Sequence, residues 1–336
     1  MIFKELKLIL QKTNFRRSLN IVKLLSSYLI SKSIKIPIHW GSPMSISIEP
    51  TTACNLHCPE CPSGLRSFSR PIGNLKFEEF QAFLNPLVTN LSSILFYFQG
   101  EPFINHELFK MIHFASIRGV YTMSSTNGHF LTVEKSNKTI DSGLDRLVIS
   151  VDGTTQETYE KYRIGGELDK VIQGIKNLVE AKKNRKSIKP LIILQFLVVR
   201  QNEHQIEEMK LIAKELEVDH LELKSAQIYN YKNGSEFIPE QEIYSRYQKN
   251  FDGTYHIKNK LLNHCWRMWQ GCVITWDGRV VPCCFDKDAS INLGMLGKEN
   301  FKNIWKGKAY KDFRTQIIKS RKNIEICKNC TEGTLV

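Results

Sequence analysis

The chain has 336 residues, enough to bury a substantial hydrophobic core, and its length suggests about two domains. With 42% hydrophobic and 24% charged residues it has the composition of a globular protein, which excludes a largely disordered or fibrous one. The sequence contains neither a secretory signal nor an apolar run long enough to span a bilayer. We therefore expect a cytoplasmic protein whose nine cysteines serve metal or cluster binding rather than disulfides.

The net charge of +13 is concentrated near the two ends of the chain. Residues 1–40 and residues 298–323 each carry a net charge of +7, whereas the remainder is nearly neutral. These basic segments are either solvated helix faces or surfaces that attract an anionic membrane, an acidic lipid, a phosphorylated substrate or nucleic acid.

Residues 1–43 form a basic amphipathic segment with one apolar helical stripe, made of Phe15, Leu19, Val22, Leu25 and Leu29. Such a stripe usually packs as a cap on a core, and this is the arrangement we expect. The alternative is that the stripe lies in a membrane interface, which would make the protein peripheral to a membrane.

Residues 44–225 alternate between short β-rich segments and segments of helical periodicity, and this alternation predicts a parallel sheet with helices packed outside it. The predicted strands are residues 44–49, 93–98, 120–125, 146–151, 191–199 and 220–225. The clearest predicted helices are residues 75–84, 106–117, 168–181 and 204–216. Six such units are too few for an eight-fold barrel, so a partial barrel and an open wound sheet both remain. In either fold, ligands bind at the carboxyl ends of the strands.

Polar motifs follow the first four predicted strands and should meet at one rim of the sheet. Cys54, Cys58 and Cys61 follow the first strand, QGEP (99–102) the second, STNG (125–128) the third and Asp152-Gly153 the fourth. Three close thiols could belong to a disulfide framework, to a zinc site completed by His57, or to an iron-sulfur cluster. We favour the cluster, because three thiolates on a cubane leave one iron open to another ligand.

A connector, residues 226–264, precedes a second unit, residues 265–336. Its clearest feature is a β-hairpin with a two-residue turn at Asp277-Gly278, which sets Cys272 opposite Cys283. Four cysteines of this unit suffice for a second cluster or, alternatively, for a structural zinc knuckle: Cys265, Cys283, Cys327 and Cys330. Cys272 is an alternative ligand.

The order of these motifs resembles the radical S-adenosylmethionine (radical SAM) superfamily, and the segment from Cys265 to the CKNC of residues 327–330 resembles its SPASM/twitch extensions. The resemblance implies an α/β fold with a partial (βα)6 TIM-like barrel, followed by a small cysteine-rich domain with a β-hairpin. It also implies that a reduced 4Fe-4S cluster cleaves SAM to a 5′-deoxyadenosyl radical, which abstracts hydrogen from a substrate, while an auxiliary 4Fe-4S cluster accepts an electron or aids substrate oxidation.

Read onto this chain, the resemblance implies that Cys54, Cys58 and Cys61 bind the SAM-dependent cluster. It also implies that the auxiliary cluster is bound by Cys265, Cys283, Cys327 and Cys330. We expect a single auxiliary cluster, because only six residues follow Cys330. The implied SAM contacts are Gln99, Gly100, Glu101, Pro102, Ser125, Asn127, Ser150, Asp152, Arg163 and Val198. Two positions depart from the family pattern: Gln99 replaces a glycine, and Glu60 stands where an aromatic residue is common.

The expected cofactors are thus two 4Fe-4S clusters and SAM, with an electron donor such as flavodoxin or ferredoxin as partner. We expect a small-molecule, sugar or lipid substrate rather than a peptide, because only about 43 residues precede the first strand, and we do not expect nucleic acid. The alternatives are a radical SAM enzyme that modifies peptides or proteins, and a non-catalytic iron-sulfur or zinc protein. No residue stands out as general acid or base.

Overall fold

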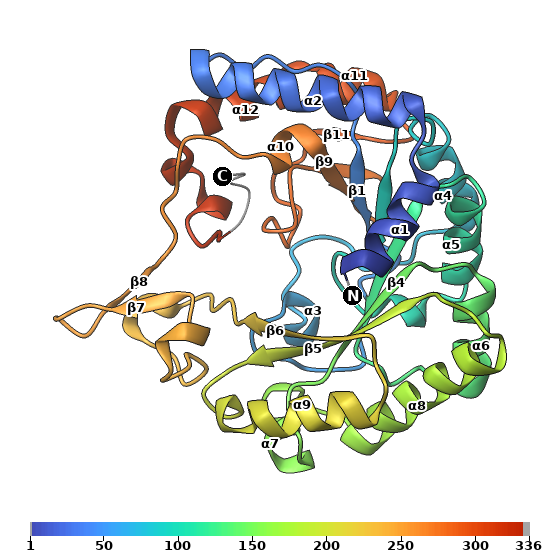
Figure 1. The fold of residues 1–336 in the computed structure, drawn as a ribbon. Helices are drawn as coiled ribbons and strands as arrows, with labels where there is room; N and C mark the ends of the chain where they lie inside the picture. Colours follow the sequence, from blue (N-terminus) through green and yellow to red (C-terminus); the bar gives the residue numbers. More distant parts are fainter. Residues whose placement is uncertain (1, 332–336) are drawn as a thin grey trace.

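In the computed structural model, which describes residues 2–331, a curved sheet carries the six predicted parallel strands in chain order (Figure 1). They are β1 Ser45–Ile48, β2 Ser93–Phe96, β3 Tyr121–Thr126, β4 Arg146–Ser150, β5 Leu191–Val198 and β6 His220–Ser225. All six fall on predicted segments. Because neighbours in the sheet are also neighbours in the chain, the order has no reversal point, and the structure is a partial barrel rather than a doubly wound sheet.

Helices cover the outer face of this sheet (Figure 1). They are α4 Phe77–Leu84, α5 Leu108–Ser116, α6 Val133–Asp141, α7 Gln156–Tyr162, α8 Leu168–Asn184 and α9 Ile206–Glu215. Alternate strand residues such as Ile46, Ile48 and Ile149 pack against them in the main core. The next residues along each strand therefore point to the inner face of the barrel.

The C-terminal unit continues the same sheet beyond β1, in the order β11-β10-β9-β1. Its strands are β9 Gly271–Ile274, β10 Arg279–Val281 and β11 Gly294–Met295, and its helices are α10 Arg267–Gln270, α11 Phe301–Lys306 and α12 Lys308–Ser320. β9 pairs with β1 in parallel, and Gly271 fits there because a Cβ would stand 1.8 Å from the Ser45 carbonyl oxygen. The connector contains a small separate sheet of β7 Tyr247–Lys249 and β8 Tyr255–Ile257.

The predicted hairpin exists, but its register is wrong by one residue. Val280 pairs with Ile274 and Val281 with Val273, so the loop has three residues, 276–278, closed by a hydrogen bond from Thr275 N to Arg279 O at 3.0 Å. Gly278 takes φ +86°, as the left-handed last residue of such a loop requires. Continued by one pair, this register sets Pro282 opposite Cys272. Cys283 is therefore not its cross-strand partner.

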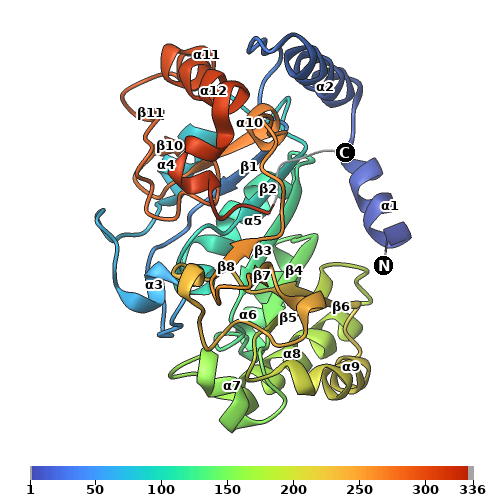
Figure 2. The ribbon, with the colours of Figure 1, turned by 90° about the vertical axis from the view of Figure 1, so that its left-hand side faces the viewer.

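Two helices, α1 Ile2–Lys12 and α2 Phe15–Ile34, form the N-terminal segment and lie along one side of the molecule (Figure 2). We expected the apolar stripe of this segment to pack as a cap on the core. This prediction is wrong, because the stripe is exposed. The buried side of α2 is mostly polar instead: Arg17, Asn20, Leu24, Ser27, Tyr28 and Ser31. Arg17 donates to backbone carbonyls of other segments, including Val88 O at 3.2 Å, and Asn20 exchanges two 2.9 Å hydrogen bonds with the backbone of Ser42.

Membrane spanning is not a property of these helices. Among residues 2–331, no helix combines the length and the apolar character that crossing a bilayer requires.

His39 joins the N-terminal segment to the C-terminal unit. Its Nε2 lies 3.1 Å from the Trp269 carbonyl oxygen, and its ring meets the Trp305 ring edge-on with centroids 5.0 Å apart. Burial, helped by the nearby Arg314 charge, lowers the pKa of His39 to about 3. The folded protein thus keeps His39 neutral, whereas the unfolded chain binds a proton at the ordinary pKa of 6.5.

The stability that His39 contributes is therefore present above pH 6.5 and is lost as the pH falls toward 3. Between about pH 7.5 and about pH 5, we expect wild type to lose about 2 kcal/mol more free energy of unfolding than His39→Gln does. Denaturant titration of both proteins at each pH measures this difference. Equal losses in the two proteins would contradict it.

Candidate functional site

The loop after β1 brings its three cysteines into one side-chain cluster. Cys54, Cys58 and Cys61 pack with Leu56 and Tyr162, and the short helix α3, Pro62–Leu65, closes the loop with Cys61 at its N-cap. Gly64 allows this closure, because a Cβ there would stand 2.5 Å from Cys58 N. His57 is exposed and lies outside the cluster, so it is not placed to complete a zinc site.

The surroundings of these thiols suit a metal-containing group, whose positive charge would stabilise their thiolate forms. Burial raises the pKa of Cys54 to about 12, and it raises the pKa of Cys58 in spite of the nearby Arg163 charge. Metal ligands must be thiolates, so thiols in such surroundings need the metal itself to hold the anionic form. Within residues 2–331, no three His, Cys, Asp or Glu side chains converge closely enough to hold one metal ion.

The QGEP loop after β2 lies directly on the cysteine loop. Gly100 adopts φ +72°, and a Cβ there would stand 2.4 Å from the Thr51 carbonyl oxygen. Gly100 N donates to Ser63 Oγ at 2.8 Å, and Glu101 N donates to Ala53 O at 2.7 Å. The first two motifs therefore form one surface, and the position of Gly100 tolerates only glycine. Gln99 and Pro102, on either side, are both buried.

Glu101 ties the second motif to the third. Its buried carboxylate accepts hydrogen bonds from Thr126 Oγ1 at 2.8 Å and from Asn127 N at 2.7 Å. Burial raises the pKa of Glu101, and the hydrogen bond from Asn127 N opposes that shift. Asn127 in turn donates from Nδ2 to Asn55 Oδ1 at 2.8 Å, which returns the network to the cysteine loop.

The fourth motif reaches the same place through an ion pair. Asp152, which is buried, accepts from Arg163 Nε and from the β5 backbone at Leu197 N, the latter at 2.8 Å. Arg163 Nη1 lies 3.9 Å from Cys58 Sγ. Asp152 thus positions the guanidinium that faces the cysteine cluster.

The remaining predicted SAM contacts divide between the two faces of the strands. Ser125 and Ser150 lie at the ends of β3 and β4, and Ser150 points away from the helix-facing Ile149. The side chain of Val198 packs in the main core. The adjacent Leu197 instead contacts the cluster that contains Cys58.

Glu60, the residue in the place of a common aromatic, holds a tyrosine of the connector. Its Oε2 accepts a 2.8 Å hydrogen bond from Tyr229 N, and Lys287 Nζ lies 4.5 Å from the centre of the Tyr229 ring. The sequence places these three residues far apart, so only the fold brings them to the edge of the cysteine loop.

The four predicted cysteines of the C-terminal unit line one cavity, together with Arg267, Met268, Phe285, Phe313, Ile317, Arg321 and Ile326. Burial and then the neighbouring Cys284 and Cys265 raise the pKa of Cys283 far above its usual range. The buried Arg321 donates from Nη2 to Cys330 Sγ at 3.1 Å. Cys272 does not line this cavity; it lines a neighbouring one, which Cys283 also borders.

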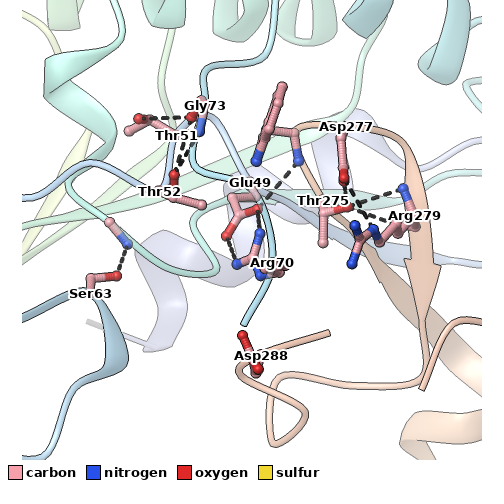
Figure 3. A network of polar contacts seen from close by, with 12 residues as sticks. Glu49, Thr51, Thr52, Ser63, Arg70, Gly73, Thr275, Asp277, Arg279 and Asp288 are labelled. Carbon is pink, nitrogen blue, oxygen red and sulfur yellow. Dashed lines mark hydrogen bonds and ion pairs between the residues drawn. The ribbon is translucent and has the colours of Figure 1, made fainter. Parts of the chain in front are cut away.

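A buried ion pair, missed by the sequence analysis, fixes the base of the cysteine loop (Figure 3). Arg70 donates to both carboxylate oxygens of Glu49, at 2.7 and 2.6 Å, and Trp276 N approaches the same carboxylate at 3.3 Å. The pair joins the end of β1, the segment after α3 and the hairpin loop of the C-terminal unit. A glutamate directly after a buried strand was the available signal, but the sequence does not identify its partner.

Comparisons with known proteins agree with this arrangement. A model of the radical SAM superfamily matches residues 48–211, and a model of the SPASM iron-sulfur cluster-binding domain matches residues 265–331. An AdoMet-dependent heme synthase of Methanosarcina barkeri is 31% identical over 142 residues, which are 42% of this chain and 40% of that protein. A PqqA peptide cyclase of Rhizobium meliloti is 24% identical over 314 residues, 86% of this chain and 79% of that protein.

The chain thus spans less than half of the heme synthase that it matches.

Solved structures add a likeness of fold. BtrN in complex with AdoMet and 2-DOIA has a TM-score of 0.53 at 17% identity, covering 88% of this chain and 95% of that chain. Streptococcus suis SuiB bound to S-adenosylmethionine has a TM-score of 0.63 at 14% identity, covering 92% and 76% respectively.

Removing one partner of the Glu49–Arg70 pair leaves a buried, uncompensated charge, so we expect Arg70→Met to lower the free energy of unfolding by about 3–5 kcal/mol. The double variant Glu49→Leu/Arg70→Met removes both charges and should recover most of that loss. Denaturant titration followed by tryptophan fluorescence measures both effects. A single variant within about 0.5 kcal/mol of wild type would show that the pair is not a structural clamp.

Proposed function

Since this chain belongs to the radical SAM superfamily and carries a C-terminal SPASM domain, we propose that Cys54, Cys58 and Cys61 bind the SAM-dependent 4Fe-4S cluster. It is a radical SAM enzyme, and such enzymes need an electron donor. The observation that carries the assignment is the gathering of three thiols into one apolar cluster, with motifs from three further strands joined to the same loop. The donor set leaves one iron of a cubane for SAM.

When bound, the reduced cluster supplies the electron that cleaves SAM to a 5′-deoxyadenosyl radical, the species that takes a hydrogen atom from substrate. The protein orients the reactants and excludes water. We assign the SAM amino group to Gly100, Glu101 and their backbone neighbours Gln99 and Pro102. A carboxylate accepts about four hydrogen bonds, and Glu101 receives three from the protein, so one acceptor position remains for a ligand ammonium group.

In this proposal, the methionyl carboxylate and the ribose of SAM are bound by Ser125, Asn127, Ser150 and Arg163. Arg163 is the natural carboxylate ligand among them, because its guanidinium is already oriented by Asp152 and faces the cysteine cluster. Asp152 then acts by positioning Arg163. In place of Val198, we propose Leu197 as the apolar contact from β5.

The second cysteine group is proposed to bind one auxiliary 4Fe-4S cluster, which accepts an electron or aids substrate oxidation. Support comes from the shared cavity of Cys265, Cys283, Cys327 and Cys330, which supplies four thiols and hence a fully ligated cubane. Cys265 shares this cavity with the other three thiols whereas Cys272 does not, which favours Cys265 as the fourth ligand.

The relatives' names include a heme synthase and peptide cyclases, so they do not define one substrate class. We propose a small molecule, a sugar or a lipid head group rather than a peptide, with flavodoxin or ferredoxin as electron donor in the cytoplasm. In support, the basic segments of residues 1–40 and 298–323 suit a small molecule or head group that carries negative charge. A radical SAM enzyme that modifies peptides is the alternative.

The central test is SAM cleavage by the anaerobically reconstituted protein under a strong reductant. We expect 5′-deoxyadenosine from wild type and from Cys272→Ala, but none from Cys58→Ala, because loss of one ligand removes the open-iron cluster. Chromatography of the products measures this. Bound iron without any SAM cleavage would instead support a non-catalytic iron-sulfur protein.

Iron counting tests the second cluster independently. Two cubanes give about eight irons per protein, and Cys265→Ala should reduce this toward about four, while Cys272→Ala keeps about eight. The two variants are matched because both remove a buried thiol. The reverse result would reassign the fourth ligand to Cys272.

A further inference from the structure

The second helix, α2, is turned the opposite way from an ordinary surface helix. Five residues of its apolar stripe are exposed: Phe15 by 81%, Leu19 by 42%, Val22 by 58%, Leu25 by 38% and Leu29 by 50%. Its polar residues are buried and hydrogen-bonded to the rest of the protein. Tyr28, for example, contacts His264 Nδ1 through its hydroxyl group at 2.8 Å. The contacts that fix α2 therefore leave the apolar face outward.

The apolar face continues beyond α2 at both ends. On α1, Phe3 is 87% exposed and Leu10 is 61% exposed. After α2, Ile36 and Trp40 are also exposed. Figure 2 shows α1 and α2 along the same side of the molecule. Since isolated exposed apolar residues are ordinary but extended rows are not, this face is a candidate interaction surface.

Basic side chains border the apolar face: Lys4, Lys7, Arg16, Lys23 and Lys35 are all exposed. The one acidic residue of the segment, Glu5, is turned inward, where it accepts from Tyr121 Oη at 3.1 Å and pairs with Arg146 at 3.3 Å. Lys4 pairs with Asp219 at 3.2 Å, but no carboxylate of residues 2–40 offsets the other four cations at the surface.

The second basic segment of the sequence lies at the same end of the molecule. Figures 1 and 2 both place α11 and α12 at the upper end, beside α2, and the His39–Trp305 ring contact joins the two regions. The exposed lysines of this segment are Lys298, Lys302, Lys306, Lys308, Lys311, Lys319 and Lys322. The fold thus brings together the two stretches in which the net positive charge of the chain is concentrated.

We propose that α1 and α2 dock this protein on an anionic membrane surface. The apolar row enters the boundary between head groups and acyl chains, while the bordering Lys and Arg side chains contact lipid phosphates. A helix of 20 residues is about 30 Å long, and an apolar row of that length with basic borders is the pattern of an interfacial helix. A second copy of the chain fits less well, because two-fold contact would bring two strongly basic faces together.

Sedimentation of the reconstituted holoenzyme with vesicles tests the proposal. We expect binding to vesicles of phosphatidylglycerol mixed with phosphatidylcholine, weaker binding at high salt, and no binding to phosphatidylcholine alone. The variant Val22→Glu/Leu29→Glu should bind at least about tenfold more weakly, because it puts carboxylates in the apolar row. Both positions are exposed, so the variant should keep its iron content and circular dichroism.

A matched control is Leu211→Glu on α9, at the opposite end of the molecule in Figure 1, where the side chain is 63% exposed. It adds a carboxylate at a comparable apolar position outside the proposed surface and should bind vesicles as wild type does. Absence of binding to anionic vesicles would overturn the proposal, as would equal weakening by Leu211→Glu. So would a dimer in light scattering that Val22→Glu/Leu29→Glu disperses while no vesicle binding occurs, which would make the face an interface between copies.

Discussion

The buried ion pair between Glu49 and Arg70 is the constraint on which the site depends. Both side chains are almost fully removed from water, a desolvation cost that only close, bidentate geometry offsets. Arg70 also stacks over the rings of Phe68 and Phe98, which fixes its orientation. Because Trp276 joins the same carboxylate, the pair holds the entrance of the cysteine loop and the first hairpin of the C-terminal unit in one arrangement.

Beyond this pair, hydrogen bonds and an ion pair within the protein connect the four motifs to one another without any cofactor. Glu101 receives donors from the STNG loop, Asn127 returns a hydrogen bond to the cysteine loop, and Asp152 orients Arg163 toward Cys58. The polar groups of these motifs are thus held in place by backbone and side-chain contacts within the protein. Such preorganisation lowers the cost of ordering them when a ligand binds.

Local patterns predicted the strands well, because a buried parallel strand imposes β-branched and apolar residues on a short segment. Local patterns failed where contacts between residues far apart in the sequence determine the structure. The hairpin register depended on whether Gly278 closes a two- or a three-residue loop, and both loops contain Asp-Gly. The orientation of α2 depended on carbonyl groups that Arg17 and Asn20 meet in other segments, which periodicity cannot reveal. Arg70 was missed for the same reason: its partner lies 21 residues away in the chain.

The pairing of β9 with β1 also has a consequence for how the protein is made. Ser45 and Gly271 are partners, so one edge of β1 stays unpaired until more than 200 further residues have been synthesised. During that interval the nascent chain presents an open strand edge next to the cysteine loop. Such edges recruit other chains, so this protein should depend on chaperones during synthesis more than its modest size suggests.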